Sequence, residues 1–465
     1  MSRVIVVGGG LIGLATSLLI AKQGHDVTVL ERDAEPRPAT PEEAIEDWAR
    51  PGVMQFRLVN FLMPRGRQLL DEHLPEVTAL LAAAGAPDYN GLHNLPPNVT
   101  DRAPRPGDER FGTLATRRQL LEYAMATVAE SAVDVRRGVH VTGLLTDGHR
   151  RVMGVELAGS ELPADLVIDA SGRRSPLPGW LAAIGAAAPA EESEELGFAY
   201  YGRHFQGPPS TAGMLPIPAG LFHYDCYSVL VLPADNGTWN ATIVTSSRDH
   251  ALRDLREEAN FTKLLSACPM HAPVLGLAPL GGMMAAAGIS DRLRPLVSST
   301  GPTVTGVLTV GDSWACTNPS LGRGISVGLL HALVTAEAVG DSLGDLSALA
   351  VEHDRLTRER VLPWYRATTQ IDRQRAAQVA AAIDGRPPAP APPNPVGQVM
   401  QDVTASMMVD ADAFRAFLEM TFMLAFPQDL LARDGFADHV RGVAAALPPP
   451  PQLGPTRQEL LAMLS

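Results

Sequence analysis

The chain has 465 residues, a formal net charge of −13, 46% hydrophobic residues and 19% charged residues. This composition is typical of a globular enzyme, and the length exceeds what one compact core usually holds. We therefore expect two domains, or one domain with a large insertion. No basic stripe offsets the acidic balance, so we expect no nucleic-acid partner.

The cysteines and the N-terminus both favour a cytoplasmic protein. The three cysteines are far apart and form no C-x-x-C pair, which argues against disulfides. The first predicted strand starts at Arg3, and no signal-peptide pattern precedes it. No apolar run reaches the roughly 18 residues that a membrane span needs, so we expect no span.

Residues 1–34 predict a strand, a glycine turn, a helix and a second strand. Gly8, Gly10 and Gly13 form a G-x-G-x-x-G pattern directly after the apolar run VIVV. In this context the first glycine permits a tight turn, the second lets a pyrophosphate approach, and the third lets helix and strand pack. Glu31 ends the second strand, where an acidic side chain binds a ribose hydroxyl. The unit predicts a dinucleotide site.

The next 150 residues alternate between loops, helices and short strands. Residues 35–65 read as a loop near the cofactor, followed by one helix from about Arg65 to Gly85 and an excursion rich in Pro, Asn and Gly. Thr116 and Gln119 predict a capping box at the start of a helix. Turn signals then divide a meander of strands that ends in ADLVIDASG, which contains Asp169 and Gly172.

Residues 195–245 change to longer alternating strands with aromatic residues, which predict a second sheet. The chain then returns to the first domain through GVLTVGD, and helices run from about Gly324 to Asp384. A Pro-rich linker over 385–395 precedes a small helical region.

The predicted fold class is α/β: a dinucleotide-binding Rossmann-like domain with an inserted β-sheet substrate domain and a C-terminal helical region. The dinucleotide-binding domain is discontinuous, over 1–85, 105–180 and 295–345. The substrate domain covers 86–104 and 181–294, and the C-terminal helices cover 346–465.

A second glycine-flanked segment, GDSWACTNPSLGRG, covers residues 311–324. Asp312 follows an apolar strand and precedes a helix, so its carboxylate needs hydrogen-bond donors such as ribityl hydroxyls. Gly322 and Gly324 let the backbone lie close to a planar ring, and the helix dipole would stabilise negative charge on a reduced flavin. Two such segments suit a long ligand such as FAD.

These motifs, together with Arg50-Pro-Gly-Val, Arg118-x-x-Leu-Glu and DASGRRS, resemble the class A FAD-dependent monooxygenases of the para-hydroxybenzoate-hydroxylase-like superfamily. The resemblance covers about residues 1–330. It implies that NAD(P)H reduces FAD, that O2 then reacts with the flavin, and that a C4a-hydroperoxide hydroxylates or epoxidises a small molecule.

The resemblance also implies roles for individual residues. Glu31 and Arg32 would hold the adenosine ribose, Arg50 and Arg118 would face the pyrophosphate, and Val53 would lie beside the flavin. Asp169 and Gly172 belong to a segment associated with FAD and the pyridine nucleotide. Gly311 and Asp312 would bind the ribityl or pyrophosphate end. Pro319 and Gly324 would form the flavin environment of catalysis, and the backbone of Arg323, Gly324 and Ile325 would bind the N1–C2=O edge; we assign no general acid or base.

The chain departs from the family's pattern at a few positions. Trp314 and Ala315 stand where many members have Ala and His, and Ser326 replaces an Asn. The arginine that closes the DASGRRS-type segment is replaced around Leu177-Pro178. Direct recognition of NAD(P)H is therefore an open question, and a separate reductase remains an alternative electron source.

Substrate contacts are expected from the second sheet and from the loop near Met54 to Phe56. The few charges in that sheet favour a hydrophobic molecule, such as a secondary metabolite. The candidate residues are aromatic or basic: Tyr200, Arg203, His223, Tyr227 and Trp239. Strand alternation allows only some of them to face a pocket, and aromatic residues on a sheet are more often core.

Three rival functions share the same cofactor. A flavin halogenase would need a suitably placed lysine, but the chain has only Lys22 and Lys263, and no W-x-W-x-I-P segment. A double-bond reductase of the geranylgeranyl-reductase type is the second rival, and a flavin-binding protein without turnover is the third. The twelve histidines lack ligand spacing, so we expect no metal site. We expect His331 and His353 to be packing or surface residues, and Cys316 to be a small buried hydrophobe.

Overall fold

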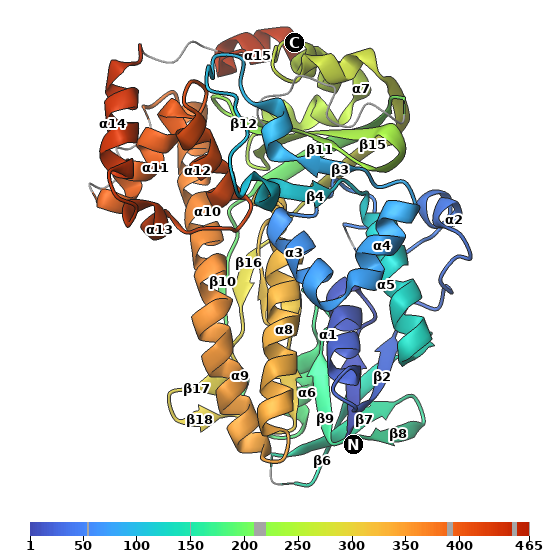
Figure 1. The fold of residues 1–465 in the computed structure, drawn as a ribbon. Helices are drawn as coiled ribbons and strands as arrows, with labels where there is room; N and C mark the ends of the chain where they lie inside the picture. The colour runs from blue at the N-terminus through green and yellow to red at the C-terminus, as the bar shows by residue number, and fades with distance from the viewer. Residues whose placement is uncertain (54, 149, 209–219, 388–393, 449–452, 465) are drawn as a thin grey trace.

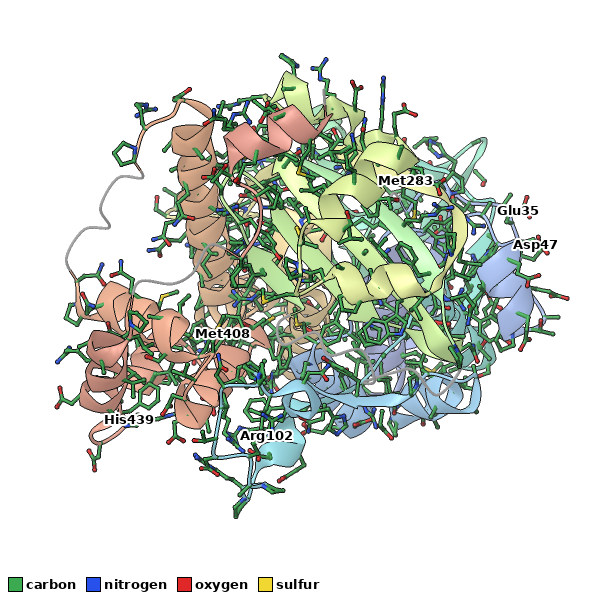
Figure 2. All side chains as sticks on the ribbon, turned by 90° about the horizontal axis from the view of Figure 1, so that it is seen from above. Glu35, Asp47, Arg102, Met283, Met408 and His439 are labelled. Atoms are coloured by element: carbon green, nitrogen blue, oxygen red, sulfur yellow. The ribbon has the colours of Figure 1, made fainter. Side chains whose placement is uncertain are left out.

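The computed structural model describes residues 1–53, 55–148, 150–208, 220–387, 394–448 and 453–464. A parallel sheet with its helices occupies the lower half of Figure 1, and an antiparallel sheet covered by α7 occupies the upper half. The C-terminal helices stand beside both. Seen from above, the helical region labelled at Met408 and His439 lies on the opposite side of the molecule from Met283 (Figure 2).

The parallel sheet has five strands in the order β19-β9-β1-β2-β5. Their bounds are Arg3–Val7 (β1), Asp26–Glu31 (β2), Asp134–Arg137 (β5), Leu166–Asp169 (β9) and Val307–Thr309 (β19). The apolar strand that we expected over VIVV is β1, and Val4, Ile5 and Val6 are buried. Helices α1 (Leu11–Ala21), α5 (Arg118–Ala132) and α8 (Gly324–Ser342) pack against this sheet and one another. This arrangement confirms the predicted Rossmann-like unit.

Two local predictions in the first half of the chain are wrong. The single helix expected over 65–85 is two helices, α3 (Pro64–His73) and α4 (Pro75–Ala83), because Pro75 starts a new helix. Thr116 does not cap α5: the N-cap is Arg117, and the Thr116 hydroxyl donates to the Arg117 carbonyl. The Arg117 amide instead donates to Asp235, a residue far along the chain. Short helix α2 (Pro41–Glu46) lies in the loop expected before α3.

The expected meander forms a three-stranded antiparallel sheet. Its strands are Val141–Thr146 (β6), Val152–Leu157 (β7) and Ser160–Pro163 (β8). Helix α6 covers Leu177–Ala183, and β3 (Asp88–Asn90) pairs with β4 (Gly112–Leu114). A small sheet joins the two halves of the molecule through β10 (Glu192–Glu194), β16 (Asp291–Leu293) and β20 (Ala315–Cys316). Strands β17 (Val297–Ser298) and β18 (Gly301–Pro302) form a hairpin.

The second predicted sheet has five antiparallel strands in the order β12-β13-β14-β11-β15. The strands are Phe198–Gln206 (β11), Leu221–His223 (β12), Ser228–Pro233 (β13), Thr238–Ser246 (β14) and Ala278–Ala287 (β15). One face packs on α7 (Glu258–Ser266), around Trp239, Ile243 and Phe261. The other face carries Tyr200 and Val244 and contacts Ala376.

Seven helices follow α8 in the described part of the chain. They are Leu346–Arg360 (α9), Leu362–Ile383 (α10), Pro395–Ser406 (α11), Ala411–Thr421 (α12), Pro427–Leu431 (α13), Phe436–Ala446 (α14) and Arg457–Leu464 (α15). Leu95 and Val99, in the excursion before β4, pack on Phe414 of α12. Part of the expected Pro-rich linker lies outside the described residues. Helices long and apolar enough to cross a bilayer do not occur among those described.

Candidate cofactor and active site

The first glycine turn has the geometry that its spacing predicts. Gly8 has φ +111°, and a Cβ there would lie 2.5 Å from the carbonyl oxygen of Ala170. A Cβ at Gly13 would lie 2.0 Å from the carbonyl oxygen of Gly8. At Gly10, by contrast, a Cβ would have no atom within 4 Å. The turn is therefore crowded on its protein side and open at Gly10, where a pyrophosphate would approach.

A group of buried charged residues lies at the C-terminal end of β2. The carboxylate of Glu31 accepts hydrogen bonds from the amides of Gly9 and Asp33, both at 2.8 Å. The Arg50 guanidinium donates to Glu31 at 2.8 Å and to Asp33 at 3.2 Å. One of its nitrogens, Nη1, has no hydrogen-bond partner and lies 3.7 Å from Glu122. Thus Arg50 holds the carboxylates of Glu31 and Asp33 at the expected adenosine end of the site. Arg32 is exposed, and Val53 is half-buried.

Arg118 connects this group with the second glycine segment. Its guanidinium donates to Glu122 one turn further along α5, at 2.6 and 2.8 Å. Its charge also reaches Asp312: burial raises the pKa of the Asp312 carboxyl, and Arg118 opposes that rise. The structure thereby brings together two acidic regions that are 190 residues apart in the sequence, as the numbering of Glu122 and Asp312 shows.

Asp169 ends β9 between the two glycine segments. Its carboxylate accepts from the amide of Ser171 at 2.9 Å and from the hydroxyls of Ser171 and Ser175. Burial nevertheless raises the pKa of this carboxyl. The side chain is thus committed to shaping the turn that includes Gly172, which has φ +82° and open space where a Cβ would be. Backbone at this turn is free to approach a ligand.

His331 holds the turn at Gly311. Its Nδ1 accepts the Gly311 amide at 3.2 Å, so Nε2 carries the proton and faces Thr357. Burial lowers the pKa of His331 well below its usual value, which keeps the ring neutral. The ring packs edge-on against Trp314 at 4.9 Å. His331 and His353 are both buried, so of the packing and surface positions expected for them the structure has the buried one, and His331 adds the hydrogen bond to Gly311.

The loop from Pro319 to Gly324 leads into α8. Gly322 has φ +67°, which favours glycine, and Gly324 is exposed, with no atom within 4 Å of where a Cβ would lie. Ile325 is buried. The side chain of Arg323 turns away from the loop: it donates to the Met420 carbonyl at 2.5 Å, and burial lowers its pKa to about 10. Only the backbone of Arg323 therefore faces the expected flavin position.

The two glycine-flanked helices α1 and α8 share a further property. Neither has a side-chain cap or an acidic residue in its first turn, so their amide groups are available to an anionic ligand. They also touch, because a Cβ at Gly328 would lie 2.6 Å from Ile12. Uncapped helix starts, open backbone at Gly10 and Gly324, and an Arg50 nitrogen without a hydrogen bond together fit FAD.

The expected substrate residues divide between the two faces of the second sheet. Tyr200 and His223 belong to one cross-strand row through Val244 and Ser228. The Tyr200 hydroxyl donates to Asn318 at 2.9 Å, directly before Pro319. Arg203 instead forms an ion pair with Glu258 of α7, and Tyr227 and Trp239 are buried in the core behind the sheet. The structure therefore brings Tyr200 beside the loop that contains Pro319 and places Arg203, Tyr227 and Trp239 elsewhere.

The loop expected near Met54 to Phe56 is described only in part. Met54 lies outside the described residues. Phe56 is buried and packs edge-on against Trp48 at 5.5 Å. It is therefore a core residue of the first domain.

Several residues around Pro319 were missed by sequence reasoning. The side-chain oxygen of Asn318 accepts a hydrogen bond from Tyr200, and the backbone amide of Asn318 donates to Asp291 at 2.7 Å. Ser320 donates to Asp372, a buried residue in the middle of α10. Asp291 and Asp372 carry no motif, and they come from β16 and from a helix outside the region of the resemblance. Only the fold brings them to the loop.

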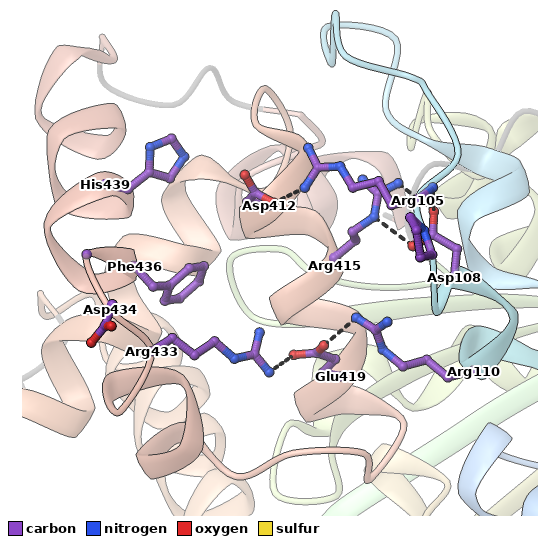
Figure 3. Close-up of a pocket in the computed structure, with 12 residues that line it drawn as sticks. Arg105, Asp108, Arg110, Asp412, Arg415, Glu419, Arg433, Asp434, Phe436 and His439 are labelled. Atoms are coloured by element: carbon purple, nitrogen blue, oxygen red, sulfur yellow. Dashed lines mark hydrogen bonds and ion pairs between the residues drawn. The ribbon is translucent and has the colours of Figure 1, made fainter.

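A separate cavity of about 470 Å³ lies between the C-terminal helices and the excursion before β4 (Figure 3). Its arginines are paired with carboxylates: Arg415 with Asp108 at 2.7 Å, and Arg110 and Arg433 with Glu419 at 2.7 and 2.6 Å. The pairs of Asp108 with Arg415 and of Arg110 with Glu419 join the excursion to the C-terminal helices across this cavity.

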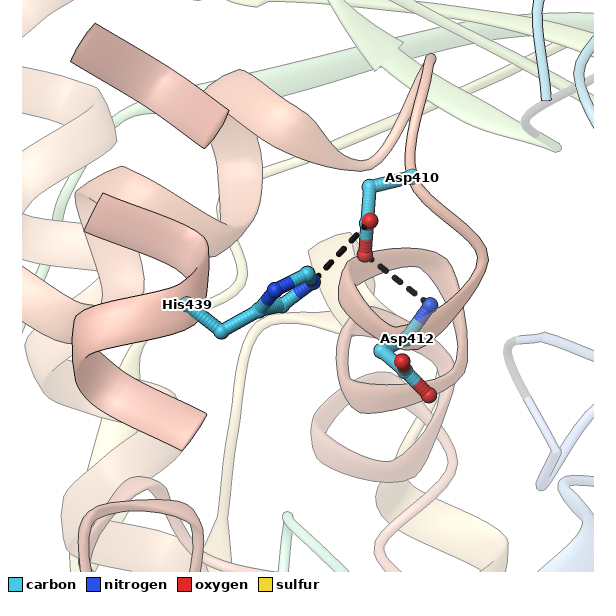
Figure 4. A group of neighbouring side chains, drawn as sticks. All are labelled: Asp410, Asp412 and His439. Atoms are coloured by element: carbon cyan, nitrogen blue, oxygen red, sulfur yellow. Dashed lines mark hydrogen bonds and ion pairs between the residues drawn. The ribbon is translucent and has the colours of Figure 1, made fainter. Parts of the chain in front are cut away.

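Asp410, Asp412 and His439 gather at the edge of this cavity (Figure 4). Asp410 caps α12 by accepting the amides of Asp412 and Ala413, and its other oxygen is 3.0 Å from His439. Asp412 binds Arg105. These oxygens already have partners that stabilise the helix, so the group is a capping arrangement. The three cysteines are free and buried, including Cys316.

Comparison with known proteins agrees with this site. Residues 3–42, which hold the first glycine turn and Glu31, match the family of FAD-dependent oxidoreductases. Over these residues the chain is similar to that family, and its overall fold is similar to that of solved flavin monooxygenases.

Particular relatives extend the match beyond that segment. Protein Rv3254 of Mycobacterium tuberculosis is 28% identical over 393 residues, which are 77% of this chain and 77% of that protein. PqsL, a probable FAD-dependent monooxygenase of Pseudomonas aeruginosa, superposes with a TM-score of 0.58 at 17% identity, over 82% of this chain and 99% of PqsL. CtdE, solved in complex with FAD and a substrate, has a TM-score of 0.58 at 16% identity, over 91% of this chain and 99% of CtdE.

Proposed function

We propose that this protein is an FAD-dependent monooxygenase that hydroxylates or epoxidises a hydrophobic small molecule with O2 and electrons from NAD(P)H. One observation carries the proposal. Helices α1 and α8 both start without a cap and touch at Ile12 and Gly328, and the loop between β19 and α8 lies against the face of the second sheet that holds Tyr200. A two-ended cofactor fits between them, and its reactive end would face that sheet.

The residues of the chain would bind and orient the cofactor. The amides at the start of α1 would bind the pyrophosphate, and Glu31 would receive the ribose hydroxyls. Asp312 would accept hydrogen bonds from the ribityl chain. The amides at the start of α8 would stabilise negative charge at the ring edge. Bound FAD would supply the redox chemistry and the activation of oxygen.

The wall beside Pro319 favours an uncharged substrate. Phe198, Tyr200, Val244 and Ile289 form an apolar cluster on this face. The buried carboxyls of Asp291 and Asp372 lie at the loop and offer no positive charge that would bind an acid. The guanidinium of Arg323 is occupied by the Met420 carbonyl. A hydrophobic molecule, such as a secondary metabolite, therefore suits this wall better than a carboxylate.

Oxygen consumption tests the proposed function. The FAD-loaded protein is mixed with NADPH or NADH and candidate hydrophobic substrates, and electron-donor oxidation, O2 uptake and product mass are followed together. We expect substrate to stimulate O2 uptake and one labelled oxygen atom from ¹⁸O2 to enter the product. A product formed without O2 would indicate a double-bond reductase, and a product that requires halide would indicate a halogenase.

The electron donor and the compartment are part of the same proposal. If neither nucleotide reduces the bound flavin but dithionite followed by O2 yields product, a separate reductase supplies the electrons. We place the protein in the cytoplasm, because all three cysteines are free and buried.

A further inference from the structure

A buried carboxyl lies directly behind the loop that contains Pro319. Asp372 occupies the middle of α10, and only 1% of its surface is exposed. One carboxyl oxygen, Oδ1, accepts a hydrogen bond from the Ser320 hydroxyl. The other, Oδ2, is buried without a hydrogen-bond partner, and Asp372 forms no ion pair with any described residue. An ionised carboxylate in this position would be costly, since one of its oxygens has no donor.

The charges around Asp372 come from three other elements. Asp291 of β16 disfavours a second negative charge, and Arg323 at the start of α8 partly compensates for it. Tyr200 of β11 is close enough for the Asp372 charge to raise the pKa of its hydroxyl. Burial is the largest effect and raises the pKa of Asp372 to about 7. The carboxyl therefore gains and loses a proton within the range in which enzymes operate.

Ser320 links this carboxyl to the accessible side of the loop. It follows Pro319, and it is half-buried, whereas Asp372 is enclosed. A hydroxyl both donates and accepts, so it can pass a proton in either direction. We propose that Asp372 and Ser320 form a proton-exchange pair that delivers a proton to an oxygen anion formed on the substrate beside Pro319.

The transfer is balanced without another reactant. For the transfer, the Ser320 hydrogen turns from Asp372 to the substrate oxygen, and the protonated Asp372 carboxyl donates to the Ser320 oxygen. The O–H bond of the carboxyl then breaks as a new O–H bond forms on Ser320, and the original Ser320 proton moves to the substrate oxygen. Asp372 becomes a carboxylate near the Arg323 cation, and solvent later restores its proton. This inference rests on the proposed monooxygenase function acting on an oxygen-bearing ring. After oxygen transfer, the ring C–H bond breaks and its proton leaves to solvent, which restores the aromatic ring and leaves an oxygen anion on the substrate for Ser320 to protonate.

Infrared spectroscopy of the FAD-loaded protein tests the carboxyl directly. Between about pH 5 and pH 9, we expect a protonated-carboxyl C=O band to disappear with a midpoint near the pKa of about 7. Asp372→Asn should lack this band. Asp402→Asn is a matched control, because Asp402 is also buried, also lies in a C-terminal helix, and also has an oxygen without a hydrogen bond. It should retain the band; a band that survives in Asp372→Asn overturns the proposal.

The absorption spectrum of bound flavin provides a second measurement that requires no turnover. We expect a pH-dependent shift near neutral pH in the wild type and in Asp402→Asn, and its loss in Asp372→Asn. Ser320→Ala should keep the carboxyl band at an altered frequency. Its kcat should be about a hundredfold lower than that of the wild type and should no longer depend on pH, while KM should change little. An unaltered pH–rate profile in Ser320→Ala overturns the exchange role, even if Asp372→Asn fails to fold.

The two proposals can fail separately. If the infrared and flavin shifts behave as expected but no substrate takes up oxygen, the monooxygenase function is wrong and the pair serves another flavin reaction. If oxygenation occurs and the wild type shows no titrating carboxyl, the proton-exchange pair is wrong and the proposed function stands.

Discussion

Both glycine segments are expected to bind FAD, but different kinds of contact hold them in shape. The turn from Gly8 to Gly13 is shaped by its own backbone and the neighbouring strand β9: a Cβ at Gly13 would meet Gly8, and one at Gly8 would meet Ala170. The loop from Gly311 to Gly324 is instead held by side chains from elsewhere. His331 binds the Gly311 amide, Asp291 binds the Asn318 amide, and Asp372 binds Ser320.

This difference has a consequence for function. A turn held by backbone packing tolerates almost no substitution, and it suits a part of the cofactor whose charge stays constant. A loop fixed by ionisable and polar side chains can respond to the charge of what lies against it. We therefore expect substitutions on the crowded side of the first turn to act on folding, and those around the second segment to act mainly on cofactor affinity and pH dependence.

The largest effect is expected at Gly13. In Gly13→Val the new side chain would collide with the Gly8 carbonyl oxygen, which is 2.0 Å from the Cβ position. We expect a loss of several kcal/mol of stability, about 3 or more, and no FAD retained on purification. Thermal unfolding by circular dichroism and the absorbance of bound flavin measure both quantities.

Gly10→Ala is the matched control, since a Cβ there meets nothing within 4 Å. The FAD-free variant should melt at the wild-type temperature, while FAD affinity should fall because the methyl group enters the space for the pyrophosphate. Equal destabilisation by both substitutions would contradict the division between a crowded and an open side of the turn.

The next largest effect is expected from Arg50→Met. It leaves the buried carboxylates of Glu31 and Asp33 without their shared cation, and removal of one partner from a buried ion pair costs about 3–5 kcal/mol. Urea unfolding of the FAD-free protein should show this loss. Arg37→Met is the control, because its ion pair with Glu130 is partly exposed and should contribute at most about 1 kcal/mol.

His331→Phe tests the second segment. The ring is kept, but the Gly311 amide loses its acceptor, which costs about 1–3 kcal/mol for a buried donor. We expect FAD affinity, measured by fluorescence titration, to fall about tenfold to a hundredfold. His353→Phe alters the stacked neighbour, 5.3 Å away, without touching Gly311. If both variants weaken FAD binding equally, the amide contact is not what holds the turn.

The smallest effect for a change of one pH unit is a pH dependence of stability from Asp372. Burial raises its folded-state pKa to about 7, above the ordinary value, so the folded protein binds this proton more tightly than the unfolded chain. The stabilisation is complete below the unfolded pKa and is lost as pH rises through about 7, by at most about 1.4 kcal/mol per pH unit. Asp372→Asn should remove this slope, measured as the difference in urea unfolding between variant and wild type. A slope that is the same in both proteins would contradict the assigned proton.

The sequence by itself determined the parts of this protein that depend on local backbone geometry. The G-x-G-x-x-G turn, the apolar strand before it and Glu31 at the end of β2 lie within 31 residues, so spacing alone specifies how they pack. The alternating strands over 198–246 likewise revealed the second sheet, because side-chain direction repeats every two residues.

Only the tertiary structure decided which side chains share a site. The alternation of residues along the strands did not predict which face of the second sheet meets the loop that contains Pro319. In the structure, Tyr200 on one face contacts Asn318, whereas Tyr227 and Trp239 are buried in the core behind the other face. Thr116 does not cap α5 as predicted: Arg117 is the N-cap residue, and its amide donates to the distant Asp235. Asp372 meets Ser320 because α10 packs across the domain, and contacts between distant segments leave no pattern in a single sequence.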